Sequence, residues 1–226
     1  MSDQIVLINF LRFPAGERIW GMKQMKVRAS VLDKMHGITF HKMLGTGGGD
    51  GYGALPDFNT YALLTVWNET ADAYEFEENS ASMKEFREHT DEIFSIFMRP
   101  VRSRGKWSGK NPFEVVTKLD KEDKMAVLTR ATLKPGYYLP FWFRVKGVSD
   151  SHIDSAGLLF SKGIGERPWI MQATFTIWDN EGAMEEFAHE RSGRHYEAIK
   201  TTRERKGFRE ELYARFKVEE TRGTFK

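Results

Sequence analysis

Strand-like and helix-like patterns alternate along the first half of the chain in a regular order. Four segments are rich in β-branched, aromatic or alternating apolar residues and are predicted to be strands: Gln4–Arg12, Gly37–Leu44, Asn59–Trp67 and Phe94–Trp107. Helical patterns occupy Glu17–Met35, where Gly21 weakens the helix, and the stretch that runs from Asn68, a candidate N-cap, to about His89. The first half therefore predicts strand, helix, strand, strand, helix, strand.

The second half predicts the same succession of elements. Its strands are expected at Met125–Leu133, Ser155–Ile164, Trp169–Trp178 and Leu212–Glu219. The first helix of this half is short and interrupted by Pro140. The second helix begins with Asp179 or Asn180 as its cap and runs from about Glu181 to Arg205.

Short similar segments in the two halves of the sequence indicate that the halves are copies of one unit. The segment Leu64–Glu69 (LTVWNE) resembles Phe175–Asn180 (FTIWDN), and Phe76 and Phe187 each follow nine residues after the tryptophan. These and further similar segments occur in the same order in both halves, as expected of a duplication.

Two βαββαβ units predict an α+β fold made of two fused ferredoxin-like repeats, of the dimeric α+β-barrel type. We expect the first repeat at residues 1–110, a polar linker at 111–123 and the second repeat at 124–226, which carries the candidate site.

Composition and charge exclude several functions. The net charge of +2, from 34 basic and 32 acidic residues, gives no electrostatic case for nucleic acid. The chain has no cysteine, which excludes disulfides, thiolate metal sites and a cysteine–haem bond. No apolar run reaches the roughly 20 residues that span a bilayer, and no signal peptide is recognised, so we expect a cytoplasmic protein.

His195 is the most informative of the six histidines. It shares one face of the last predicted helix with a mostly apolar set of residues: Met184, Phe187, Ala188, Arg191, Ala198, Ile199 and Thr202. A neutral imidazole that faces a cavity is the ligand that haem iron needs. The other interpretation is a buried histidine bonded to a backbone carbonyl. Arg191, one turn earlier, fits a propionate or a surface salt bridge equally well.

Two further segments have open interpretations. The glycine cluster at Gly45–Gly53 lacks the features of a nucleotide-binding loop, and is either a loop over a cavity mouth or a plain connection. The basic segment Arg104–Lys110 has two interpretations. It either binds acidic groups, of an electron donor or of the haem propionates, or it is a solvated strand end at the start of the linker. No pattern of residues supports hydrolysis.

Several motifs together resemble the spheroidene monooxygenase family. They span nearly the whole chain and include Pro56–Trp67, Phe160–Pro168, Gln172–Trp178, Phe208–Phe216 and the Gly-x-His-x-x-Ala-Ile stretch Gly193–Ile199. Each motif is unremarkable alone, but their order and number are specific. Many residues outside the motifs, above all on the charged helix faces, do not resemble the family, so the substrate stays open.

The resemblance implies a haem-dependent monooxygenase that converts a carbon of an acyclic carotenoid, or a similar apolar molecule, to a ketone. O2 and a reduced ferredoxin-type donor would be used, and haem b would be held by His195 as iron ligand with Arg191, Phe187 and Ile199 around it. An apolar substrate of this kind also implies peripheral membrane contact. Whether the protein forms homo-oligomers is left open.

Two alternatives share this scaffold, because fold alone does not define activity. One is a cofactor-free monooxygenase or another small-molecule enzyme. The other is a non-catalytic haem- or lipid-binding protein.

Overall fold

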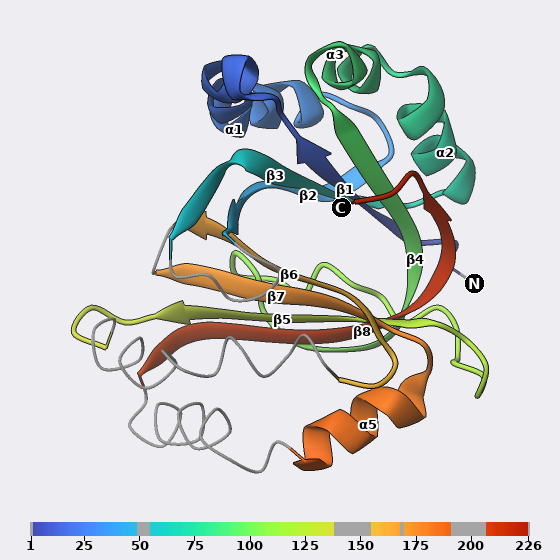
Figure 1. Cartoon of the computed structure of the whole chain (residues 1–226). Coiled ribbons are helices and arrows are strands. Elements are labelled where there is room, and N and C mark those ends of the chain that lie inside the picture. Colours follow the sequence, from blue (N-terminus) through green and yellow to red (C-terminus); the bar gives the residue numbers. More distant parts are fainter. Residues whose placement is uncertain (1, 49–54, 138–154, 168–169, 191–206, 226) are drawn as a thin grey trace.

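The computed structural model describes residues 2–48, 55–137, 155–167, 170–190 and 207–225 (Figure 1). Within these residues the strands are β1 Ile5–Arg12, β2 Ile38–Gly47, β3 Pro56–Trp67, β4 Glu92–Gly105, β5 Met125–Leu133, β6 Leu158–Arg167, β7 Met171–Trp178 and β8 Phe208–Arg222. The helices are the short 3-10 helix η1 Ala15–Glu17 and the α-helices α1 Arg18–Leu32, α2 Thr70–Asn79, α3 Ala81–His89 and α5 Glu181–Glu190.

The strands close into one antiparallel barrel in the order β1-β3-β2-β6-β7-β5-β8-β4. The first half contributes the neighbours β4-β1-β3-β2, and the second half contributes β8-β5-β7-β6 in the same relative order. Two seams join the halves. The β4–β8 seam is long, whereas the β2–β6 seam consists of the pairs Gly45–Gly165 and Thr46–Ile164. The predicted α+β barrel is confirmed.

Inward-facing side chains from all eight strands fill the barrel with one apolar core. Alternation along each strand sends every second residue inward. At the centre, the rings of Phe10 and Phe160 lie 4.8 Å apart and those of Phe10 and Phe175 lie 5.7 Å apart. The barrel interior is therefore a packed core and not a chamber for a ligand.

The helices lie on the outside of the barrel, on opposite sides of the molecule. Figure 1 shows α1, α2 and α3 over the sheet of the first half and α5 below the sheet of the second half. Fourteen buried apolar residues form the core beneath the first group, including Leu7, Leu63 and Phe76. None of the described helices is long and apolar enough to span a bilayer.

The similar segments of the two halves form the same local contacts. Trp67 donates its indole N–H to the Thr65 hydroxyl at 2.8 Å, and Trp178 donates to Thr176 at 2.9 Å. The Trp67 ring packs on Phe76 at 5.1 Å and 44°, and the Trp178 ring packs on Phe187 at 4.8 Å and 42°. The predicted correspondence of these segments is confirmed.

The single helix predicted from Asn68 to His89 is wrong, because it breaks at Ser80. The Ser80 side chain accepts a hydrogen bond from the Met83 N–H and so starts α3. Asn68 is not the cap of α2 either. The first N–H group of that helix, on Thr70, donates instead to the carboxylate of Asp3 at 3.0 Å.

The other boundaries differ by a few residues. The strand predicted from Ser155 begins at Leu158, and the last strand is longer than expected at both ends. Asn180 caps α5 as predicted, by accepting a hydrogen bond from the Ala183 N–H at 3.0 Å. The helix with Pro140 and the part of the last helix after Glu190 lie outside the described residues.

Candidate functional site

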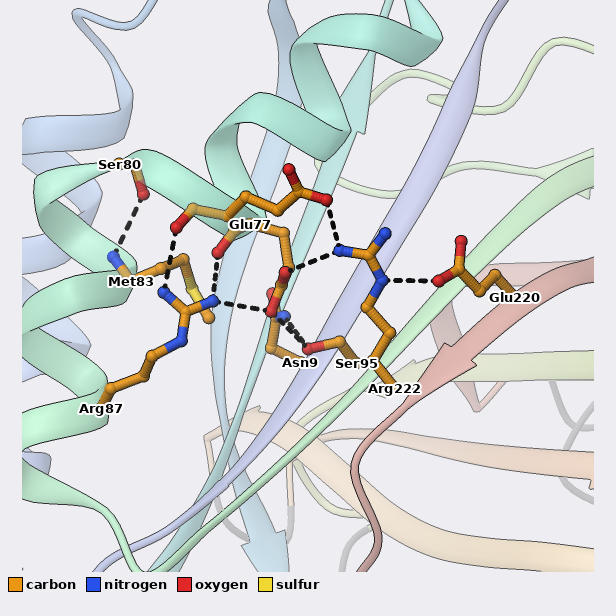
Figure 2. A network of polar contacts seen from close by, with 9 residues as sticks. Asn9, Glu77, Ser80, Met83, Arg87, Ser95, Glu220 and Arg222 are labelled. Atoms are coloured by element: carbon orange, nitrogen blue, oxygen red, sulfur yellow. Dashed lines mark hydrogen bonds and ion pairs between the residues drawn. The ribbon is translucent and has the colours of Figure 1, made fainter.

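The outer face of the first-half sheet is sealed beneath its helices. Asn9 of β1 lies between Leu63 of β3 and Ser95 of β4, and none of the three is more than 1% exposed. Asn9 donates to the Ser95 hydroxyl at 2.8 Å, and that hydroxyl donates to the carboxylate of Glu77 on α2 at 3.3 Å (Figure 2). This polar network therefore links the sheet to α2 beside the apolar core.

Two arginines complete the network around Glu77. Its carboxylate pairs with Arg87 at 2.9 Å and with Arg222 of β8 at 3.2 Å (Figure 2). Arg222 also binds Glu78 at 2.8 Å and Glu220 at 2.6 Å. A pocket of about 290 Å³ opens here. Because both guanidinium groups already bind carboxylates of the chain, the pocket is a structural junction between the halves.

In the part of the chain that the structure describes, no helix covers the equivalent place in the second half. Thr129 of β5 lies between Thr174 of β7 and Tyr213 of β8, in the register that Asn9 has in the first half. Thr129 is exposed, while Thr174, Tyr213 and the neighbouring Ala131 are half-buried. The Tyr213 hydroxyl accepts a hydrogen bond from Nε of Arg215 at 2.6 Å. This open outer face of β5, β7 and β8, which we call the β5 face, is the candidate site.

Helix α5 borders the β5 face and presents the side that the sequence predicted. Met184 is buried, and Phe187 packs on Trp178 and on the apolar cluster at this end of the sheet. Arg215 of β8 pairs with Glu181 at 2.5 Å and so ties α5 to the sheet. Phe187 thus lies between helix and sheet.

The other predicted site residues, Arg191, His195 and Ile199, lie outside the described residues. Their roles as iron ligand and haem contacts stay predictions.

The histidines whose side chains are described all belong to the first half. His41 pairs with Asp33 at 2.9 Å, and it faces away from the buried Phe40 as predicted. His89 pairs with Glu17 at 3.0 Å and stacks on Trp20, and His36 is exposed. No group of three or more histidine, aspartate or glutamate side chains suited to a metal occurs among the described residues.

The chemistry of the β5 face fits one wall of a site for a flat apolar group. Threonine and alanine side chains are small, so they leave the surface of the sheet accessible, and the Tyr213 ring adds an aromatic edge. These residues offer no nitrogen or sulfur ligand for iron. The Tyr213 phenol is the group on this face that could ligate haem iron, and a histidine ligand would have to come from elsewhere in the chain.

The basic segment Arg104–Lys110 closes one end of the barrel. Trp107 is buried, and its indole N–H donates to Glu166 at 3.2 Å. The guanidinium of Arg130 lies 5.3 Å from the centroid of that ring and binds both Glu166 and Glu210. The interpretation as a solvated strand end is therefore wrong for Trp107. Sequence reasoning missed this ion cluster, since its members come from separate strands.

Two carboxylates of this cluster have lowered pKa values. Burial alone raises the pKa of Glu166, but Lys42 and Arg130 outweigh it through their hydrogen bonds and charges. Burial likewise raises the pKa of Glu210, and the N–H groups of Gly109 and Ser108 together with Arg130 bring it below the ordinary value. Both groups are therefore held as carboxylates.

The closed barrel with outer helices and one open sheet face defines an α+β-barrel protein with a candidate site on its second half. Among solved structures, an aldoxime dehydratase in complex with butyraldoxime aligns with 95% of this chain and 79% of its own, with a TM-score of 0.59 and 11% identity. Likeness at this identity supports the fold alone.

Sequence relatives define the family. The spheroidene monooxygenase of Cereibacter sphaeroides is 35% identical over 216 residues, which are 95% of this chain and 67% of the relative. That of Rhodobacter capsulatus is 33% identical over 98% of this chain and 92% of the relative. No family profile matches. The chain belongs to the spheroidene monooxygenase family and is an oxidoreductase of the monooxygenase class.

Proposed function

We propose that this protein is a haem-dependent monooxygenase that oxidises an acyclic carotenoid or a similar apolar molecule. The open β5 face carries the proposal, because the equivalent surface of the first half is sealed by Asn9, Ser95 and Glu77. The names of the relatives support the substrate class, since each is called spheroidene monooxygenase.

The proposed cofactor is haem b, with His195 as the axial ligand of its iron and Arg191 as the partner of a propionate. Phe187 and Ile199 would contact the macrocycle. The histidines His36, His41 and His89 are poor candidates, because they lie on the first half and two of them already pair with carboxylates. When bound, haem supplies the activation of O2. The β5 face would form one wall of the site that holds haem and the apolar substrate, and would exclude water.

The proposed reaction is two hydroxylations at one carbon, followed by loss of water. Each hydroxylation inserts one oxygen atom of O2 into a C–H bond. The other oxygen atom leaves as water after it takes up two electrons and two protons. The diol formed by the second step loses water and gives the ketone. A ferredoxin-type protein would supply the electrons, one at a time.

We also propose that the chain consists of two ferredoxin-like repeats, at 1–110 and 124–226, joined by the linker 111–123. The shared strand order of the halves and the matched contacts of Trp67 and Trp178 support this division. The linker holds no regular element, but Phe113 packs on Phe216 with the ring centroids 5.0 Å apart.

The visible spectrum of the purified protein after haem reconstitution tests the proposed function. We expect a Soret band at one haem per chain, loss or a large shift of that band in His195→Ala, and an unchanged band in the matched variant His36→Ala. His36 is a suitable control because its side chain is exposed and lies on the first half.

Each alternative predicts a different result. A colourless protein that resists reconstitution and still oxidises substrate would favour a cofactor-free monooxygenase. Haem binding without O2 uptake, with carotenoid and reduced ferredoxin present, would favour a haem or lipid carrier. A Soret band that persists in His195→Ala would assign the iron to another ligand.

A further inference from the structure

The outer face of α1 carries an unusual share of the exposed apolar surface. Eight large hydrophobic side chains are exposed in the described part of the chain, and four of them lie on this one helix. They are Ile19, Met22, Val27 and Val31, between 39% and 65% exposed. Exposed apolar side chains that gather on one surface helix indicate a binding surface for another protein, a membrane or a ligand.

Basic side chains share this face with the apolar ones. Helical spacing places the exposed residues of α1 in two adjacent rows, and Arg18, Lys23 and Lys26 lie in the same rows as the apolar side chains. No aspartate or glutamate occurs between Arg18 and Leu32. The exposed face of α1 is therefore both apolar and cationic.

The other described helices lack this pattern. The exposed side chains of α2 and α3 include Glu75, Glu78, Lys84 and Glu88, and those of α5 include Glu185 and Glu186. None of the exposed large hydrophobic side chains lies on α2, α3 or α5. The pattern on α1 is thus a local property and does not follow from the composition of the whole surface.

The opposite face of α1 packs on β2, β3 and α3. Gly21 lies against the Phe13 ring, where an added Cβ would come within 3.0 Å. The buried Arg28 binds Ser82 at 2.9 Å and Glu85 at 2.7 Å on α3. The helix is held as a rigid element that presents its outer face.

Further apolar surface borders the first turn of α1. Arg18 donates a hydrogen bond to the side chain of Asn59, and the adjacent Phe58 of β3 is 58% exposed. Leu55, just before that strand, is 75% exposed.

We infer that the outer face of α1 binds the surface of a bilayer that contains anionic phospholipids. Apolar side chains interspersed with lysine and arginine, with no acidic residue between them, are typical of helices that lie in the membrane interface. The cations would meet the phosphate groups while the apolar side chains enter the boundary of the acyl chains. This inference rests on α1 alone and does not depend on the proposed cofactor or substrate.

Vesicle sedimentation with the full chain tests the inference. We compare vesicles of phosphatidylcholine with vesicles that contain 30% phosphatidylglycerol, and we expect binding only to the anionic ones. Ile19→Gln combined with Met22→Gln should abolish most of this binding. Lys23→Gln combined with Lys26→Gln should lower it by roughly fivefold for each lost charge. The matched control is Val115→Gln combined with Lys84→Gln, which removes one exposed apolar and one exposed basic side chain elsewhere and should bind as the unaltered chain does.

A site-specific probe shows whether α1 itself touches the bilayer. The chain contains no cysteine, so Ser30→Cys on the exposed face of α1 can carry a single polarity-sensitive fluorophore. Its emission should shift to shorter wavelength with anionic vesicles, whereas the same probe at Lys84→Cys should not respond. Circular dichroism confirms that each variant is folded.

Equal binding by the α1 variants and the unaltered chain would overturn the inference, and so would a silent probe at position 30. Light scattering tests the other occupant of such a face. If the chain is a dimer that the α1 variants make monomeric, and vesicles are not bound, the face is an interface between copies of this chain. The haem spectrum would be unaffected by either result, so the two proposals fail separately.

Discussion

At the scale of single residues, Arg130 holds the ion cluster that closes the barrel end next to Trp107. Its side chain is 3% exposed and pairs with Glu166 at 3.1 Å and Glu210 at 2.5 Å. Removing one partner of a buried ion pair leaves an uncompensated charge, which costs about 3–5 kcal/mol. The same pairs make stability depend on pH.

We predict that the contribution of Glu166 and Glu210 to stability is lost in acid. Their pKa values are below the ordinary 4.5 in the folded chain, so the stabilisation is fully present above pH 4.5 and disappears as the pH falls through the lower folded-state values. Urea unfolding of Glu166→Gln combined with Glu210→Gln should show a deficit against the unaltered chain that shrinks below pH 4.5. Glu88→Gln, on the exposed face of α3, is the control. A deficit that stays constant from pH 3 to pH 6 would contradict the assignment.

At the scale of elements, the seam between β4 and β8 depends on close backbone approach. Gly105 has a φ of +96°, and a Cβ there would lie 2.2 Å from the carbonyl oxygen of Glu211 on β8. Gly223 has the corresponding place in the second half, with a φ of +77°. A Cβ added to Gly223 would lie 2.1 Å from the carbonyl oxygen of Ile93 on β4. Each of these glycines follows an arginine, Arg104 or Arg222, and the two Arg-Gly pairs mark where the halves meet.

We predict that Gly105→Ala is much more destabilising than Gly109→Ala. Both positions need a left-handed backbone, which costs an alanine about 1–2 kcal/mol. Gly109, with a φ of +85°, has no atom within 4 Å of an added Cβ, so it measures that backbone cost alone. The overlap at Gly105 should add more than about 1 kcal/mol in urea unfolding. Equal losses for the two variants would show that the seam tolerates a side chain.

Strand positions were predicted well because their signal is local. Runs of β-branched and aromatic residues marked all eight strands, and their alternation assigns the inner and outer faces. The cap of α3, Ser80, is a local signal that the prediction of one long helix overlooked. The cap of α2 was missed for a physical reason. The N–H of Thr70 is satisfied by Asp3, 67 residues away in the sequence, and such a contact leaves no local pattern.

At the scale of the whole molecule, the two halves share one strand order but differ in their outer faces. The first is sealed by the Asn9–Ser95–Glu77 network, and the second leaves Thr129 exposed. The residue after Phe76 is Glu77, whereas the residue after Phe187 is Ala188, so the acid that anchors the network is not repeated in the sequence.

The α+β barrel and the sheet-facing side of α5 could be predicted from sequence, but the exposed face of β5 could not. Exposure of Thr129 depends on which helices cover the sheet, and threonine on a strand carries no signal of its own. The ion cluster of Arg130 was missed for the same reason, since barrel closure brings its members together.

The β5 face is proposed to form one wall of the site that binds haem. Haem titration of Thr129→Trp tests it most directly, because the large ring would occupy the space in front of the sheet while the exposed position lets the chain fold. We predict at least a tenfold loss of haem affinity, and no change for Thr39→Trp, an exposed threonine on a first-half strand. Unchanged haem affinity in Thr129→Trp would contradict the account.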